Sequence, residues 1–123
     1  MIVYLSGGMR SGWRDKVKSA LPQVQFLDPA EHGLKEPDQY TAWDLAAIRK
    51  CDVVFVYFEA TNPSGFGLSL EIGYARALGK VAILIDEQSD NDQHNILRAT
   101  SDCTALTLQE GIEWLRSMQA CYV

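Results

Sequence analysis

Short, continuous apolar runs bounded by turn residues constrain the fold of this chain more than any other feature. The runs VVFVYF at residues 53–58 and VAILI at residues 81–85 are interrupted by no charged residue. Strands buried on both faces have this composition, and they occur in parallel sheets that are covered by helices. The sequence therefore predicts a parallel sheet at the centre of the molecule.

Weaker patterns complete the predicted sheet and place helices between its strands. Residues 2–5 and 24–27 read as two further strands, and residues 104–107 as a candidate edge strand. The segments with helical character are residues 12–21, 38–50, 68–78 and 108 to about 120. Asp38 is a plausible N-cap and Gly79 a plausible helix stop. Residues 86–102 are polar and are predicted to form a loop with a helical turn in it.

This alternation of strands and helices predicts an α/β fold, a three-layer sandwich with right-handed crossovers. A chain of 123 residues is expected to form one domain over residues 1–123. Ligands of such sheets bind at the carboxyl ends of the strands, where the strand order reverses. Any chemistry is therefore expected in the segments that follow the first three strands, residues 6–14, 28–44 and 59–71.

Charge and cysteine content exclude several classes of function. The formal net charge is −5, and the basic residues do not cluster. A nucleic-acid polymer is therefore a poor candidate partner, although a small anionic ligand stays possible. The three cysteines form no CxxC pair, and both histidines lie far from them in sequence, so neither a disulfide framework nor a metal site is indicated. No cofactor is implied.

Hydrophobic patterning gives no sign of a membrane association. The first apolar run, of about five residues, lacks the basic region and the longer core of a signal peptide. No stretch approaches the roughly 20 apolar residues that a membrane span requires. We therefore expect a cytoplasmic protein that does not bind membranes.

Glu71 stands out because it lies on the apolar stripe of the predicted helix 68–78. Leu68, Ile72, Ala75 and Leu78 share this stripe, and a carboxylate among them is costly unless it is paired or hydrogen-bonded. One explanation is that an acidic residue near a helix start favours the helix dipole. The other is a functional role, which the glycine-rich loop NPSGFG before the helix favours. This loop matches neither a P-loop nor a dinucleotide-binding motif.

Two other segments carry candidate binding groups. The loop after the first strand combines donors that suit a phosphate, although a flexible turn is the alternative; these donors are Ser6, Gly7, Gly8, Arg10, Ser11 and Arg14. Asp44 lies within the predicted helix 38–50. It is either a surface residue or a carboxylate directed at a sugar hydroxyl.

Taken together, these motifs resemble the nucleoside 2-deoxyribosyltransferase superfamily. The resemblance rests on Tyr4 in VYLSGG, on Asp44 in WDLAAIRKCDVVFVY and on Glu71 in SLEIGYARALGK. It spans roughly residues 2–86 and fades in the C-terminal third. It implies a flavodoxin-like or Rossmann-like parallel sheet of about five strands, and an enzyme that cleaves the N-glycosidic bond of a 2'-deoxynucleoside.

The resemblance also implies roles for individual residues. Glu71 would be the nucleophile that forms a deoxyribosyl ester, which a second nucleobase then intercepts. Tyr4 would support the Glu71 carboxylate, and Asp44 would grip the deoxyribose hydroxyls. The loop before the helix would face the leaving base, but it departs from the family pattern because Asn62 and Ser64 replace the acidic residue of many members. Asn62 could bind a base edge, beside the backbone of Gly65 and Gly67.

A second resemblance leaves the reaction open. The stretch GGMRSGWRD is similar to the first loop of the deoxynucleoside monophosphate N-glycosidases, which use water as the acceptor. Arg10, Ser11 and Arg14 would then hold the 5'-phosphate. A non-catalytic nucleotide-binding module is the third possibility.

Only the resemblance indicates a quaternary structure. Members of the superfamily are commonly homodimers or higher homo-oligomers in which the C-terminal residues of a neighbour complete the site. Tyr122 in the tail ACYV could do this, although a frayed terminus is the alternative.

Overall fold

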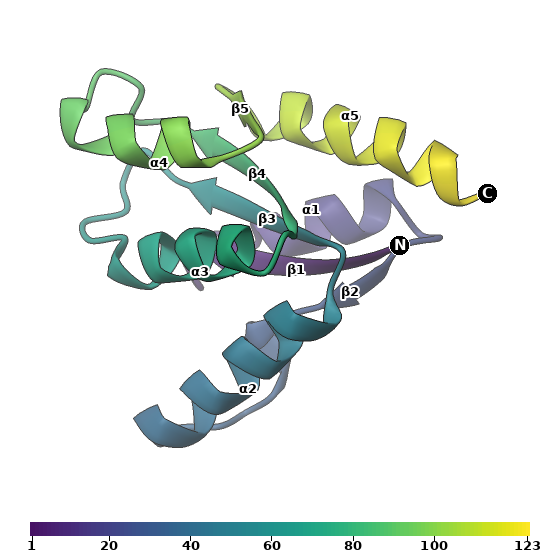
Figure 1. Cartoon of the computed structure of the whole chain (residues 1–123), viewed down its shortest axis with the longest axis horizontal. Coiled ribbons are helices and arrows are strands. Elements are labelled where there is room, and N and C mark those ends of the chain that lie inside the picture. The colour runs from purple at the N-terminus through teal and green to yellow at the C-terminus, as the bar shows by residue number, and fades with distance from the viewer.

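A five-stranded parallel sheet forms the centre of the molecule (Figure 1). The computed structural model describes all residues, 1–123. The strands are β1 (Ile2–Gly7), β2 (Gln25–Leu27), β3 (Val53–Phe58), β4 (Val81–Asp86) and β5 (Cys103–Ala105). Their order is β2-β1-β3-β4-β5, and every neighbouring pair is parallel. The predicted α/β fold with a flavodoxin-like sheet of five strands is confirmed.

Helices cover both faces of this sheet (Figure 1). They are α1 (Trp13–Ala20), α2 (Pro37–Lys50), α3 (Phe66–Ala77), α4 (Asn95–Thr100) and α5 (Leu108–Gln119). Three short 3-10 turns are η1 (Pro29–Glu31), η2 (Asp92–His94) and η3 (Ala120–Tyr122). The apolar residues of α1 and α5 pack on one face, and those of α2, α3 and α4 pack on the other. None of the helices has the length and apolar character needed to cross a bilayer.

Strand β3 shows why the sequence contains an uninterrupted apolar run. Its six residues are all buried. Phe55 belongs to the core beneath α1 and α5, whereas its neighbours Val54 and Val56 belong to the core beneath α2, α3 and α4. Because successive side chains of a strand point to opposite faces, a central strand between two helical layers has no position for a polar residue.

Helix boundaries differ from the sequence prediction by one or two residues, and the starts of α2 and α3 show why. Helix α2 begins at Pro37, a residue suited to a first helical turn, and Glu36 occupies the N-cap position. The prediction of Asp38 as N-cap is therefore wrong. Helix α3 begins at Phe66, directly after Gly65, whose φ of 87° lies in the left-handed region. The predicted stop of this helix at Gly79 is confirmed, since Leu78 is the C-cap residue.

The apolar stripe of α3 is shorter than the pattern predicts. Leu68, Ile72 and Ala75 are buried, but Leu78 is 42% exposed and does not join the core. Glu71 nevertheless lies next to Ile72 and faces the sheet, as described below.

The polar segment 86–102 folds around a buried carboxylate. Asp86 ends β4 and is fully buried, where it pairs with Arg98 of α4 and lies 3.1 Å from Nδ1 of His94. These contacts fix a six-residue helix, α4, where the sequence suggested only a helical turn. The edge strand runs from Cys103 to Ala105 and not over the predicted residues 104–107.

The sheet topology selects one crevice. The chain passes from β1 outward to β2 and then returns to the other side of β1 to form β3, so the strand order reverses between β1 and β3. Loops that leave the carboxyl ends of these two strands diverge to opposite faces and open a hollow between them. The three segments that the sequence assigned to this edge meet there.

Candidate active site

A cavity of about 350 Å³ lies at the carboxyl ends of β1 and β3, between α2 and α3. Strand β1, the loop after it and the first turn of α1 contribute Tyr4, Ser6, Gly7, Gly8 and Arg14 to the lining. Helix α2 contributes Asp44. The β3–α3 connection and α3 contribute Asn62, Ser64, Gly65, Gly67 and Glu71. Of the candidate residues, only Arg10, Ser11 and Tyr122 do not line this cavity.

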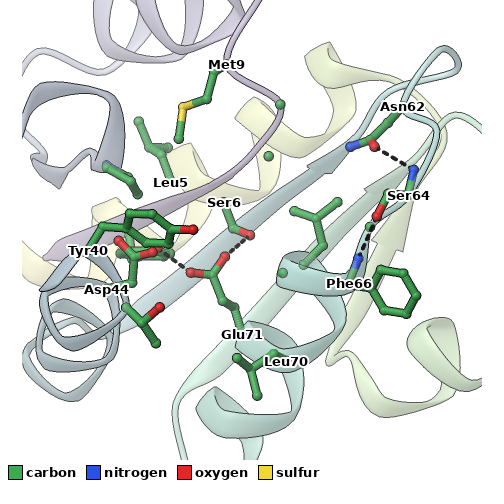
Figure 2. A pocket seen from close by; sticks show the side chains of 18 of the residues that line it. Leu5, Ser6, Met9, Tyr40, Asp44, Asn62, Ser64, Phe66, Leu70 and Glu71 are labelled. Atoms are coloured by element: carbon green, nitrogen blue, oxygen red, sulfur yellow. Dashed lines mark hydrogen bonds between the residues drawn. The ribbon is translucent and has the colours of Figure 1, made fainter. Parts of the chain in front are cut away.

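The Glu71 carboxylate is held by two hydroxyl groups of β1. Its Oε1 accepts a hydrogen bond from Oγ of Ser6 at 2.7 Å, and its Oε2 accepts one from the hydroxyl of Tyr4. Figure 2 shows the carboxylate extending from α3 toward Ser6 at the cavity wall. These donors explain how a carboxylate can occupy a core-facing position of an apolar helix.

The surroundings of Glu71 move its pKa toward neutral pH. Burial raises the pKa of Glu71 to about 7, against the hydrogen bonds from Tyr4 and Ser6, which act to lower it. For Tyr4, burial and then the charge of Glu71 raise the pKa far above its usual value. Tyr4 therefore stays protonated and always donates. The carboxylate is oriented, accessible from the cavity and basic enough to exist in both forms near pH 7.

Asp44 supplies a second carboxylate on the opposite wall. It projects from α2 into the cavity (Figure 2), and its Oδ1 is buried without a hydrogen-bond donor. Burial raises the pKa of Asp44, while the nearby His32 acts in the opposite direction. Nε2 of His32 lies 3.7 Å from this Oδ1. A carboxylate that lines a cavity is suited to accept a hydrogen bond from a hydroxyl group of a ligand.

His32 is a residue that sequence reasoning missed. Its Nδ1 accepts a hydrogen bond from the backbone N–H of Leu34 at 2.9 Å, so the neutral ring carries its proton on Nε2, the atom that faces Asp44. The one available signal was its place in the segment 28–44, at the carboxyl end of the second strand. Neither composition nor spacing indicated a contact with Asp44.

Arg14, which the sequence assigns to a phosphate, braces the loop that it follows. Only 6% of the residue is exposed. Its Nη2 donates to the carbonyl oxygen of Gly7 at 3.0 Å, its Nη1 donates to that of Gly8, and its Nε lies 2.9 Å from Oδ1 of Asp28. The guanidinium is thus engaged by the protein, although it borders the cavity.

Arg10 and Ser11 lie outside the main cavity. Both are exposed and line a neighbouring hollow of about 520 Å³, together with Glu59. The two hollows share Gly8, Met9 and Asn62. Any phosphate in the second hollow would meet one arginine and one carboxylate. Glu59 is the second residue near the site that sequence reasoning missed.

The polar side chains of the loop between β3 and α3 form hydrogen bonds with the backbone of the same segment. Oδ1 of Asn62 accepts a hydrogen bond from the backbone N–H of Ser64, and Oγ of Ser64 accepts one from that of Phe66 (Figure 2). These contacts order the start of α3, and they leave the amide nitrogen of Asn62 without a partner in the protein, so that it can donate to a base edge. Gly65 is required here because a Cβ atom would lie 2.4 Å from the Phe58 ring.

The remaining candidates lie apart from the cavity. Tyr122 is 54% exposed in η3, and the C-terminus lies toward the end of the sheet where β1 begins (Figure 1). Tyr122 could therefore meet a cavity only in a neighbouring subunit. All three cysteines are free, and no group of three His, Cys, Asp or Glu side chains is placed to hold a metal ion.

Solved structures of the same fold include two 2-deoxyribosyltransferases and an N-glycosidase. The enzyme of Leishmania mexicana is 22% identical with a TM-score of 0.61, over 71% of this chain and 65% of the enzyme. The 2-deoxyribosyltransferase of Bacillus psychrosaccharolyticus is 18% identical with a TM-score of 0.69, over 89% of each chain. The CMP N-glycosidase of Clostridium botulinum is 22% identical with a TM-score of 0.68, over 96% of this chain and 99% of the glycosidase. This chain spans less than two thirds of the length of the Leishmania enzyme.

Sequence comparison gives the family directly. Among curated proteins, none matches its sequence significantly. The family described as nucleoside 2-deoxyribosyltransferase like matches residues 1–89, which include β1, α2, β3 and α3, the elements that enclose the cavity. The chain belongs to the nucleoside 2-deoxyribosyltransferase-like family.

Proposed function

We propose that this protein cleaves the N-glycosidic bond of a 2'-deoxynucleoside and transfers the deoxyribose to a second nucleobase, with Glu71 as the nucleophile. The observation that carries the proposal is the Glu71 carboxylate, which lines an open cavity and is oriented by the hydroxyls of Tyr4 and Ser6. Family membership supports the same reaction class. The cavity, at about 350 Å³, falls within the usual range for small-molecule sites.

The reaction has two displacements at the anomeric carbon. An oxygen of ionised Glu71 attacks C1', the N-glycosidic bond breaks, and the base leaves with the bonding electron pair and takes a proton from water. In the second step a ring nitrogen of the incoming base attacks C1', loses its proton to solvent and releases the carboxylate. Splitting one displacement into two in this way is the logic of a retaining glycosidase.

Asp44 and Tyr4 have separate roles in this proposal. The Asp44 carboxylate, which lines the cavity opposite Glu71, accepts a hydrogen bond from a deoxyribose hydroxyl and so fixes the sugar above Glu71. Tyr4 and Ser6 keep the nucleophile in one orientation. Holding the reacting atoms in position removes much of the entropic barrier to a displacement of this kind.

Hydrolysis of a deoxynucleoside 5'-monophosphate is the second candidate. Arg10 and Ser11 favour it, because they border a hollow that adjoins the main cavity. The charge balance favours a nucleoside instead, since Arg14 is engaged by Asp28 and by backbone carbonyls, and Glu59 offsets Arg10 in the same hollow. We therefore place the nucleoside first. In an oligomer, Tyr122 of a neighbour is a further candidate ligand for the base.

The test is to incubate the protein with 2'-deoxynucleosides and with their 5'-monophosphates, each with and without a free base. Base exchange that requires the second base, and that is lost in Glu71→Gln, supports the transferase. Release of base from monophosphates alone would favour the hydrolase. Binding without turnover, unchanged in Glu71→Gln, would leave only a binding module. Glu36→Gln is the matched control, because Glu36 is exposed and its side chain caps no backbone group.

A further inference from the structure

One amide side chain just after the end of β4 holds the loop that forms a wall of the cavity. Nε2 of Gln88 donates two hydrogen bonds, to the carbonyl oxygens of Glu59 and Asn62, each at 2.9 Å. The two acceptors lie at the start and in the middle of the β3–α3 loop, residues 59–65. Gln88 itself is fixed, since its backbone N–H donates to Oδ1 of the fully buried Asp86 at 2.9 Å.

Glu87 anchors the first part of the same loop from the same strand end. Its Oε1 accepts a hydrogen bond from the backbone N–H of Ala60 at 3.0 Å, and its Oε2 accepts one from the Tyr57 hydroxyl at 2.7 Å. Its own N–H donates to the carbonyl oxygen of Phe58 at 3.0 Å. Glu87 therefore reaches only the first residues of the loop, and Gln88 is the residue that reaches Asn62.

The restrained loop contributes directly to the cavity. Asn62, Ser64 and Gly65 line it, and no regular secondary structure lies between the end of β3 at Phe58 and the start of α3 at Phe66. Within the loop, Asn62 bonds to Ser64, so a displacement of Asn62 moves Ser64 with it. Glu71 is fixed independently by Tyr4 and Ser6.

We propose that Gln88 is a positioning residue, which acts on substrate binding by holding the loop 59–65 against the cavity. The expected effect on KM rests on the proposed function, because it requires that the protein turns over a nucleoside. A glutamine is suited to this position because both hydrogens of one Nε2 are used on two carbonyl oxygens. A glutamate has the same shape but offers no donor and places a negative charge against both carbonyls.

The test compares Gln88→Glu and Gln88→Met with Gln93→Glu. Gln88→Met keeps the length of the side chain without a charge. Gln93→Glu is the matched charge control, because Gln93 is exposed in η2 and its side chain makes no hydrogen bond. With the deoxynucleoside that the wild type uses fastest, both Gln88 variants should raise KM about tenfold, as expected for about 1.4 kcal/mol of lost positioning. Gln93→Glu should leave KM within about twofold of wild type.

Two further readouts separate positioning from simple destabilisation. The apparent pKa in the pH profile of kcat/KM should stay at the wild-type value, because Glu71 keeps its donors. Amide hydrogen exchange of residues 60–65 should accelerate in both Gln88 variants, and this measurement needs no substrate. It therefore tests the restraint even if no nucleoside is turned over. A lower melting temperature with unchanged KM and unchanged loop exchange would overturn the proposal.

Discussion

Oγ of Ser6 lies 2.7 Å from Oε1 of Glu71 and so connects the end of β1 to the second turn of α3. The two residues are far apart in sequence, and parallel pairing of β1 with β3 brings their elements together. The contact accounts for the charge on an otherwise apolar helix face. It also predicts how the activity of the protein depends on pH and on the groups around Glu71.

The first prediction concerns the pH dependence of the wild type. Only ionised Glu71 can attack C1', and burial raises its pKa to about 7. We therefore expect kcat/KM for a deoxynucleoside to rise with pH and to level off above a midpoint near 7, as measured by base release between pH 5 and 9. A profile that is flat across this range would contradict the assignment of Glu71 as the ionising group.

Removal of the Ser6 hydroxyl should move this midpoint. The Ser6 hydrogen bond lowers the pKa of Glu71, so Ser6→Ala should raise it and shift the limb of the kcat/KM profile upward by about one pH unit. The loss of rate should be large at pH 6 and small at pH 9. Ser64→Ala is the control, because Oγ of Ser64 accepts from a backbone N–H and does not contact Glu71. An unshifted midpoint in Ser6→Ala would contradict the account.

Stability should respond to pH through the same carboxylate. Its pKa is higher in the folded state than in the unfolded chain, so its contribution to stability is fully present below about pH 4 and is lost as pH rises to about 7. Glu71→Gln has no such loss. Between pH 4 and pH 8, the free energy of unfolding of Glu71→Gln should therefore rise by about 3 kcal/mol relative to that of the wild type. Urea unfolding at both pH values measures it, and a difference that is independent of pH would refute the burial of Glu71.

A stability prediction away from the cavity concerns the contact of α5 with the sheet. A Cβ atom at Gly111 would lie 2.5 Å from Cγ1 of Ile85 and 3.0 Å from the Phe55 ring. Gly111→Ala should therefore lower the free energy of unfolding by about 1–3 kcal/mol. Gly73→Ala on α3 meets no atom within 4 Å and should raise it by about 0.5–1 kcal/mol, since alanine favours a helix. Equal effects of the two substitutions would show that α5 does not approach the sheet this closely.

Much of the fold was predictable because it depends on local patterns. The apolar runs of β3 and β4 indicated a parallel sheet, and the glycine at position 79 marked the end of α3. Glu71 could be singled out because a charge on an apolar helical stripe is visible in the sequence alone. The edge strand and the start of α2 were misplaced by one or two residues, as short elements with weak caps often are.

The contacts that complete the site could not be predicted in this way. Arg14 pairs with Asp28, His32 lies beside Asp44, and Gln88 donates to the β3–α3 loop, and each contact joins different elements of the chain. Such partners depend on the register of the strands and on side-chain rotamers, which leave no periodic signal in the sequence. The sequence identifies the groups at the carboxyl edge, and the tertiary structure decides which of them face the cavity.

The most direct measurement is to trap the sugar on the protein. A nucleoside with a 2'-fluoroarabinosyl sugar should form the ester with Glu71 and release it slowly, because fluorine disfavours the cationic transition state of the second step. Mass spectrometry of the digested protein should then find the added fluorosugar on the peptide that contains Glu71, and none in Glu71→Gln. Base release from a deoxynucleoside by the wild type, without any such adduct and at the same rate in Glu71→Gln, would contradict the account.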